Sequence, residues 1–217
     1  MVMAGIKTYF GGWRIALALV LGACIGSANA GPAEDYAAGM VSYQRTDFFV
    51  AVPLLRKAAD AGHIEAAVVL ATIYDGAEQD EQAVIYFRKA ADAGSAEGMY
   101  GLGNMLAAGE GTTKDVVAAK ALFVKAADAG HVTSVQLLAQ AYLRGELGIP
   151  EEQRKGAEAL KWITAAADLN FIPALEALQQ AYLSGDYGLT VDPVKSEQIK
   201  QKIISLKPVP PKKRRRG

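Results

Sequence analysis

Two histidines, His63 and His131, are the residues of this chain best suited to acid–base or metal chemistry. Each follows the closing glycine of a recurring motif, and the two copies are two repeat units apart. At about 10 Å per stacked unit, roughly 20 Å would separate them, so they cannot share a metal ion. A histidine at such a position is expected to cap a helix or to face solvent. We therefore predict no metal site and no cofactor.

The sequence patterns of common enzyme active sites are absent from the chain. There is no Gly-x-Ser-x-Gly, no His-Glu-x-x-His, no phosphate loop and no pair of cysteines. Gly101-x-Gly103 follows no predicted strand, so we interpret it as a packing feature and not as a nucleotide loop. No serine or cysteine has an identifiable base beside it in the sequence pattern. The chain is therefore predicted not to be an enzyme, and a cell-wall-acting enzyme is the least supported alternative.

A different set of residues suits binding. Side chains that both donate and accept hydrogen bonds recur at one repeat position: Thr72, Asn104, Gln140 and Gln180. Amides at regular spacing can pair with the backbone of an extended peptide. Further polar residues on the same helices would complete the groove: Glu65, Glu97, Tyr100, Gln136 and Glu176. The alternative is an ordinary solvated face.

Tyrosines recur two residues after this polar series, at Tyr74, Tyr142 and Tyr182. A ladder of tyrosines could bind ligands. The favoured interpretation is that each ring packs between units with its hydroxyl at the edge of the core.

An internal repeat positions all of these residues. Lys57–Gly62 reads Lys-Ala-Ala-Asp-Ala-Gly and returns at 89–94 and 125–130, with a degenerate copy over Ala165–Asn170. The copies are 32, 36 and 40 residues apart. A unit this short cannot bury its own apolar face, so copies must stack on one another.

Apolar residues recur at helical spacing on both sides of the motif, so each unit is predicted to be two helices. Asp115 is the expected N-cap of one helix and Gly130 its expected end, while Pro53 is expected to kink another. The predicted fold is an all-α, right-handed α-solenoid of antiparallel helix pairs over residues 31–206. The predicted pairs are 47–61 with 64–74, 80–93 with 96–107, 115–130 with the helix through 135–142, and 151–169 with 172–183, flanked by single helices over 33–45 and 193–205.

The segment Gly101–Gly111, followed by Asp115, Ala119 and Lys125–Gly130, resembles the Sel-1-like repeat, a relative of the tetratricopeptide repeat. The family pattern has Leu-Gly, an aromatic residue three positions on, Gly-x-Gly, a capping Asp and then Lys-Ala-Ala with a closing Gly. This copy has Leu106 in place of the aromatic residue. The resemblance implies a helical repeat fold, a concave face lined by one helix of each pair, and an adaptor role in multiprotein complexes, often after export from a bacterial cell.

The N-terminal 30 residues have the features of a signal peptide. Lys7 and Arg14 form a positive region, residues 15–26 carry no charge, and residues 27–30 end in a small-x-small pattern that predicts cleavage before Gly31. The uncharged run is shorter than the roughly 20 residues that span a bilayer. Leu21-Gly22-Ala23-Cys24 also resembles a lipobox, so lipidation at Cys24 remains an alternative.

The formal net charge of zero hides an acidic body and a basic end. Of 23 basic residues, two lie in the predicted signal peptide and six from position 207 onward, which leaves 15 against 23 acids, a charge of −8. Residues 207–217 are rich in proline and are expected to form a disordered basic tail. Five cationic side chains are candidates for binding an anionic envelope surface: Lys212, Lys213, Arg214, Arg215 and Arg216. A solubility tail without a target is the alternative.

From these features we predict a periplasmic adaptor or scaffold that binds a protein partner through the concave face of the repeats. Its partner would be a periplasmic or envelope protein, and the signal peptide argues against nucleic acid. The alternative is an outer-membrane structural lipoprotein held by Cys24.

Overall fold

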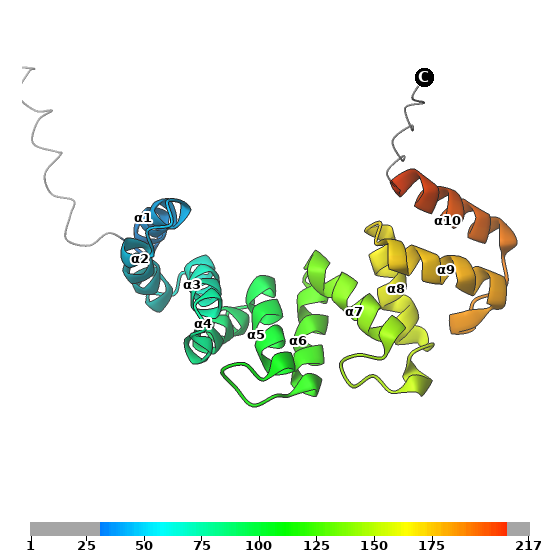
Figure 1. Ribbon diagram of the computed structural model, residues 1–217, viewed down its shortest axis with the longest axis horizontal. Coiled ribbons are helices and arrows are strands. Elements are labelled where there is room, and N and C mark those ends of the chain that lie inside the picture. Colours follow the sequence, from blue (N-terminus) through cyan, green and yellow to red (C-terminus); the bar gives the residue numbers. More distant parts are fainter. Residues whose placement is uncertain (1–30, 208–217) are drawn as a thin grey trace, which may run out of the picture.

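Residues 31–207 are described by a computed structural model, and over that range the protein is a curved stack of helices without a strand (Figure 1). The predicted all-α solenoid is therefore confirmed. The α-helices are α1 (Pro32–Gln44), α2 (Phe48–Asp60), α3 (Ile64–Gly76), α4 (Asp80–Asp92), α5 (Ala96–Ala108), α6 (Val116–Asp128), α7 (Val132–Arg144), α8 (Ala157–Asp168), α9 (Ile172–Ser184) and α10 (Pro193–Leu206). Two single 3₁₀ turns accompany them, η1 (Glu151–Gln153) and η2 (Asp186–Gly188).

The predicted signal peptide, the candidate lipidation site Cys24 and the basic residues Lys212–Arg216 lie outside the described residues. Between residues 31 and 207, no helix combines the length and the apolar run that a membrane span requires.

The recurring motif is the signal that ends α2, α4, α6 and, in its degenerate form, α8. Its closing residue adopts a left-handed conformation, with φ of +96° at Gly62 and +89° at Gly94 and Gly130. The next N–H then bonds to the carbonyl five residues earlier, as from His131 to Ala126 at 2.9 Å. In the degenerate copy Asn170 takes the same conformation with φ +61°, which asparagine tolerates better than most residues.

Two aspartates of the motif, Asp60 and Asp128, form ion pairs with lysines on the next even-numbered helix. Lys89 lies 3.1 Å from Asp60, the aspartate of the preceding motif. Lys161, one helical turn before the degenerate motif, lies 2.9 Å from Asp128 in the same way. These pairs are largely exposed, so each contributes at most about 1 kcal/mol, but they favour one register between successive even-numbered helices.

Two glycines let α5 approach both of its neighbours. A Cβ on Gly101 would lie 2.3 Å from the Phe87 ring of α4, and a Cβ on Gly103 would lie 2.7 Å from the Phe123 ring of α6. The first ring belongs to the N-terminal half of the core and the second to the C-terminal half. The interpretation of Gly101-x-Gly103 as a packing feature is confirmed.

Three local expectations meet different outcomes. Asp115 is the N-cap of α6, as predicted, and accepts N–H bonds from Val117 and Ala118. The helix predicted from residue 151 begins only at Ala157, because Gly156 is extended at φ −82°, ψ 179° and residues 151–153 form only a 3₁₀ turn. Pro53, which was expected to kink its helix, lies inside α2, and α2 is continuous from Phe48 to Asp60.

Candidate functional site

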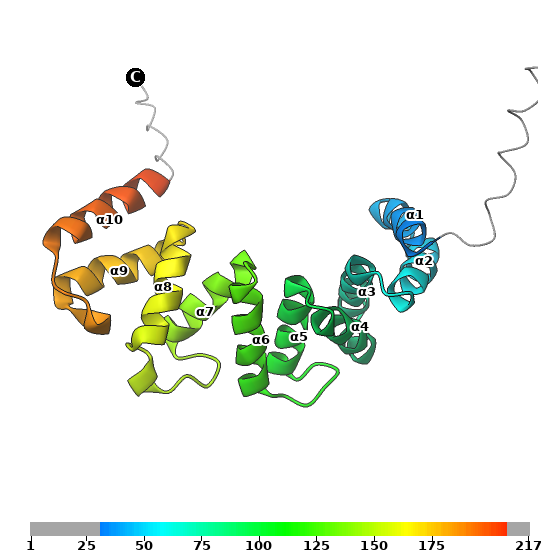
Figure 2. The same cartoon turned by 180° about the vertical axis from the view of Figure 1, so that it is seen from behind.

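The predicted groove residues lie on α3, α5, α7 and α9, which alternate with the even-numbered helices along the stack (Figure 1 and Figure 2). Thr72 and Gln180 are exposed, whereas Asn104 and Gln140, in the middle of the array, are half-buried. We call these four residues the polar row. Its members occupy the same position on successive odd-numbered helices, so the row recurs once in every repeat unit.

The amides of the polar row are open to a partner. Within residues 31–207, the side chains of the row members Asn104, Gln140 and Gln180, and of Gln136 beside them on α7, make no hydrogen bond to another residue. Thr72 differs, because its hydroxyl donates to the Val68 carbonyl at 3.0 Å. At the C-terminal end, Glu176 forms an ion pair with Lys207 at 3.2 Å. The middle of the row therefore offers the most hydrogen-bonding capacity.

Tyr100, the aromatic member of the predicted groove, packs into the array on one side. Its ring centre lies 5.9 Å from that of Phe123 and 4.8 Å from that of His131. The side chain is only half-buried, so part of it still faces outward beside Asn104 on the same helix.

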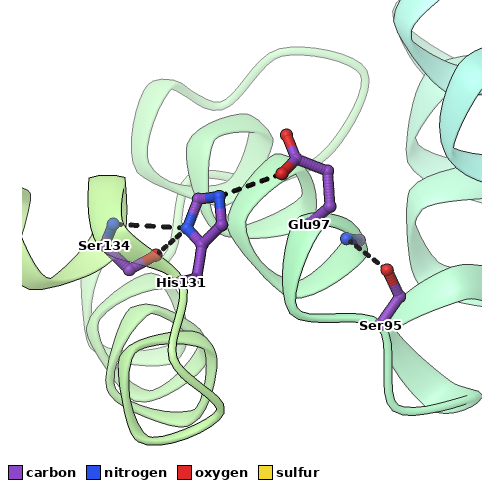
Figure 3. A network of polar contacts seen from close by, with 5 residues as sticks. Ser95, Glu97, His131 and Ser134 are labelled. Carbon is purple, nitrogen blue, oxygen red and sulfur yellow. Dashed lines mark hydrogen bonds and ion pairs between the residues drawn. The ribbon is translucent and has the colours of Figure 1, made fainter.

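His131 links α5 and α7 in a network that the sequence did not predict (Figure 3). Its Nδ1 accepts the Ser134 backbone N–H at 3.2 Å and lies 2.8 Å from the Ser134 hydroxyl. Because Nδ1 accepts, the neutral ring carries its proton on Nε2 and donates to Glu97 at 2.9 Å. The ring thereby caps α7 and ties it to the first turn of α5.

Serine, histidine and glutamate together suggest a catalytic triad, but the geometry does not support one. Ser134 is completely buried and its hydroxyl faces the same nitrogen that its own N–H uses. A substrate carbonyl therefore cannot reach the Ser134 hydroxyl. The cluster is therefore explained by its structural role, which is to cap α7 and join it to α5.

His63 occupies the equivalent position two repeat units earlier in the chain. Its Nδ1 accepts the Ala66 N–H at 3.3 Å, and its ring stacks on Tyr36 at 4.3 Å. The capping interpretation is thus confirmed for both histidines. No group of three or more potential metal ligands occurs in the described part of the chain.

The cap at His131 can be tested by comparison with the preceding repeat, where Ser95 accepts the Gly98 N–H at 3.1 Å. We expect His131→Ala to lower the free energy of unfolding by about 1 kcal/mol, the usual loss on removing an N-cap. His131→Ser should recover part of that loss, since serine caps the same position one unit earlier. Urea denaturation followed by circular dichroism measures both. Equal stability of the alanine and wild-type proteins would show that the cap contributes nothing.

The tyrosines at this repeat position serve mainly to pack the core of the array. Tyr74 and Tyr142 are buried and Tyr182 is half-buried, so the rings pack between units. The expectation that every hydroxyl lies at the edge is wrong for Tyr142, whose hydroxyl is buried without a hydrogen-bond partner among the described residues. Burial raises the pKa of Tyr142 strongly, and the nearby Glu158 carboxylate raises it further. The phenol therefore stays protonated at physiological pH.

An apolar pocket near the N-terminal end was not predicted from the sequence. It has a volume of about 790 Å³ and lies among α1, α2 and α3. Its walls include Tyr43, Phe48, Val52 and Ile73, and Phe49 at its rim is 92% exposed. The consecutive apolar residues at the start of α2, Phe-Phe-Val, are the sequence signal that could have indicated it.

Arg56 and Thr72 also line this pocket. The Arg56 guanidinium donates a hydrogen bond to the Tyr74 hydroxyl and lies 5.9 Å from the centre of that ring. The hydrogen bond to Tyr74 raises the pKa of Arg56, so this cation is present at every physiological pH. Since Thr72 belongs to both, the pocket adjoins the N-terminal end of the polar row.

Comparison with known proteins identifies the repeat. Residues 44–63, 64–95, 96–131 and 136–171 match the Sel1 repeat family. These matches group α3 with α4 and α5 with α6, so the repeat boundaries are shifted by one helix from the pairs predicted from the sequence. Each matched unit with both helices therefore begins with an odd-numbered helix that carries a member of the polar row. None of the curated proteins compared matches the chain.

Solved structures share the fold. The chain is similar to c5321, a protective antigen present in uropathogenic Escherichia coli strains with an SLR fold, at a TM-score of 0.69 and 26% identity. The alignment covers 80% of this chain but only 38% of that one. A Sel1 repeat protein from Oxalobacter formigenes aligns with a TM-score of 0.61 and 20% identity over 81% of this chain and 74% of that one. One from Klebsiella pneumoniae subsp. pneumoniae aligns at 0.50 and 22% over 80% and 86%.

Proposed function

This chain belongs to the Sel1 repeat family, and from that membership we propose that it is a non-catalytic adaptor that holds an extended segment of a partner protein along its odd-numbered helices. The observation that carries the proposal is the polar row, whose central amides are half-buried and have no hydrogen-bond partner within the described residues. A half-buried amide without a partner is costly to exclude from water, so a ligand that supplies donors and acceptors gains by binding there.

The spacing of the row suits a peptide backbone. Each amide has one acceptor and two donor hydrogens, which match the carbonyl and N–H groups of an extended chain regardless of its side chains. Stacked repeats present such groups at regular intervals along a continuous surface. Tyr100, whose outer part lies beside Asn104, supplies an aromatic contact next to the row.

We propose that the adaptor acts in the bacterial periplasm, on the basis of the signal-peptide pattern before Gly31. The partner would be a periplasmic or envelope protein, and the basic residues Lys212–Arg216 would add attraction to an anionic envelope surface. The lipobox-like Leu21–Cys24 supports an alternative, an outer-membrane structural lipoprotein. The intact mass of protein isolated from cells separates the two, because a chain starting at Gly31 and an acylated chain starting at Cys24 differ in mass.

The groove is tested by truncating its two central amides. We expect Asn104→Ala with Gln140→Ala to lower the affinity for the partner tenfold or more, because each lost hydrogen bond at a half-buried site costs about 1–3 kcal/mol. The measurement is recovery of crosslinked partner from cells that make each variant at equal level, followed by titration with the partner identified.

The matched control truncates two exposed residues of the even-numbered helices, Lys125 on α6 and Thr164 on α8. Neither makes an ion pair or side-chain hydrogen bond within residues 31–207. Lys125→Ala with Thr164→Ala should leave recovery unchanged. If the control removes the partner and the amide pair does not, binding takes place on the even-numbered helices and the proposal is wrong.

A further inference from the structure

The apolar pocket among α1, α2 and α3 differs in charge from the rest of the protein. The body between the predicted signal peptide and tail has a formal charge of −8, yet no acidic residue among those that the structure describes lines this pocket. Its one charged lining residue is Arg56, which forms no ion pair within the described residues. The pocket therefore complements a group that is apolar and negatively charged.

Backbone geometry adds a hydrogen-bond acceptor at the rim. Pro53 has no N–H to donate to the carbonyl of Phe49, four residues earlier in α2. Both residues line the pocket, and Phe49 is among the most exposed apolar side chains of the described residues. The pocket thus combines apolar walls, one cation and a backbone carbonyl that lacks its usual helical partner.

We infer that this pocket binds the C-terminal residue of the partner segment, with its apolar side chain between α1, α2 and α3 and its α-carboxylate on the Arg56 guanidinium. The inference rests on the proposed function, because Thr72 places the pocket at the N-terminal end of the polar row. A segment held by the row would end in the pocket.

The terminal residue is favoured over an internal acidic residue for a geometric reason. In an extended chain, successive side chains point to opposite faces, so an acidic residue next to an apolar one directs its carboxylate away from the same pocket. The α-carboxylate of a terminal residue is attached to the same Cα as the apolar side chain. Both groups can then enter one recess, whose volume of about 790 Å³ lies in the range of ligand pockets.

The test uses synthetic peptides and isothermal titration. The probe is acetyl-Ala-Ala-Ala-Phe with a free C-terminus, and its C-terminal amide is the uncharged comparison. We expect amidation and the substitution Arg56→Gln each to weaken binding about tenfold, and the two together to weaken it no more than either alone, since both remove the same ion pair. Arg88→Gln on α4, also an exposed arginine, is the matched control and should change nothing.

Three results would overturn the inference. One is equal affinity for the acid and the amide. Another is equally tight binding of acetyl-Ala-Asp-Ala-Phe-amide, which would place a side-chain carboxylate on Arg56. A third is Arg56-dependent binding of dodecanoate without binding of the free-acid peptide, which would indicate a lipid site. If the peptides fail while truncation of Asn104 and Gln140 still releases the partner, the pocket inference fails and the proposed function stands.

Discussion

Leu102→Asp is expected to unfold the middle of the array. Leu102 is 3% exposed and lies in the N-terminal core cluster between the two glycines at which α5 packs closely on α4 and α6. A carboxylate at this position lies among the buried apolar side chains of that cluster and loses its hydration, which should cost several kcal/mol. Thermal unfolding followed by far-ultraviolet circular dichroism measures the loss.

Ala121→Asp on α6 is the control for the charge itself, because Ala121 is exposed. That variant should melt within a few degrees of the wild-type protein. A Leu102→Asp protein that melts at the wild-type temperature would contradict the burial of α5 in the stack.

Phe123→Ala should lower the stability of the fold nearly as much as Leu102→Asp. Phe123 is 1% exposed, fills the space left by Gly103, and contacts the Tyr100 ring that in turn meets His131. Truncating a buried phenylalanine costs about 3–5 kcal/mol, because the lost contacts are only partly replaced when neighbours relax. In a stack of units that stabilise one another only through nearest neighbours, loss at the centre should also weaken the cooperativity between the two halves.

Phe49→Ala is the matched control, with the same change at a side chain that is 92% exposed. It should shift the free energy of unfolding by no more than about 0.5 kcal/mol. Urea denaturation of the two variants gives the comparison directly. Similar losses at both positions would mean that the rim of the pocket, and not only the core, stabilises the fold.

Local patterns in the sequence were enough to predict the helices and most of their ends, although not the start of α8 at Ala157. Lys-Ala-Ala-Asp-Ala-Gly predicted a repeat, and the glycine or asparagine that closes each copy follows the end of α2, α4, α6 or α8, where Gly62, Gly94, Gly130 and Asn170 all have positive φ. Asp115 was identifiable as an N-cap because its side chain acts within three residues of its own position. Such signals depend on near neighbours in the chain, so the sequence by itself determined that the protein is an array of helices.

Contacts between units were decided only in the tertiary structure. His131 meets Glu97, 34 residues away, and Lys161 meets Asp128, 33 residues away, through the stacking of separate repeats. The pocket among α1, α2 and α3 depends on how three helices leave space between them, which no spacing of residues reveals. Hydrophobic periodicity tells which face of a helix is buried but not which side chains cover it, and for that physical reason the contacts between units and the pocket could be found only in the folded array.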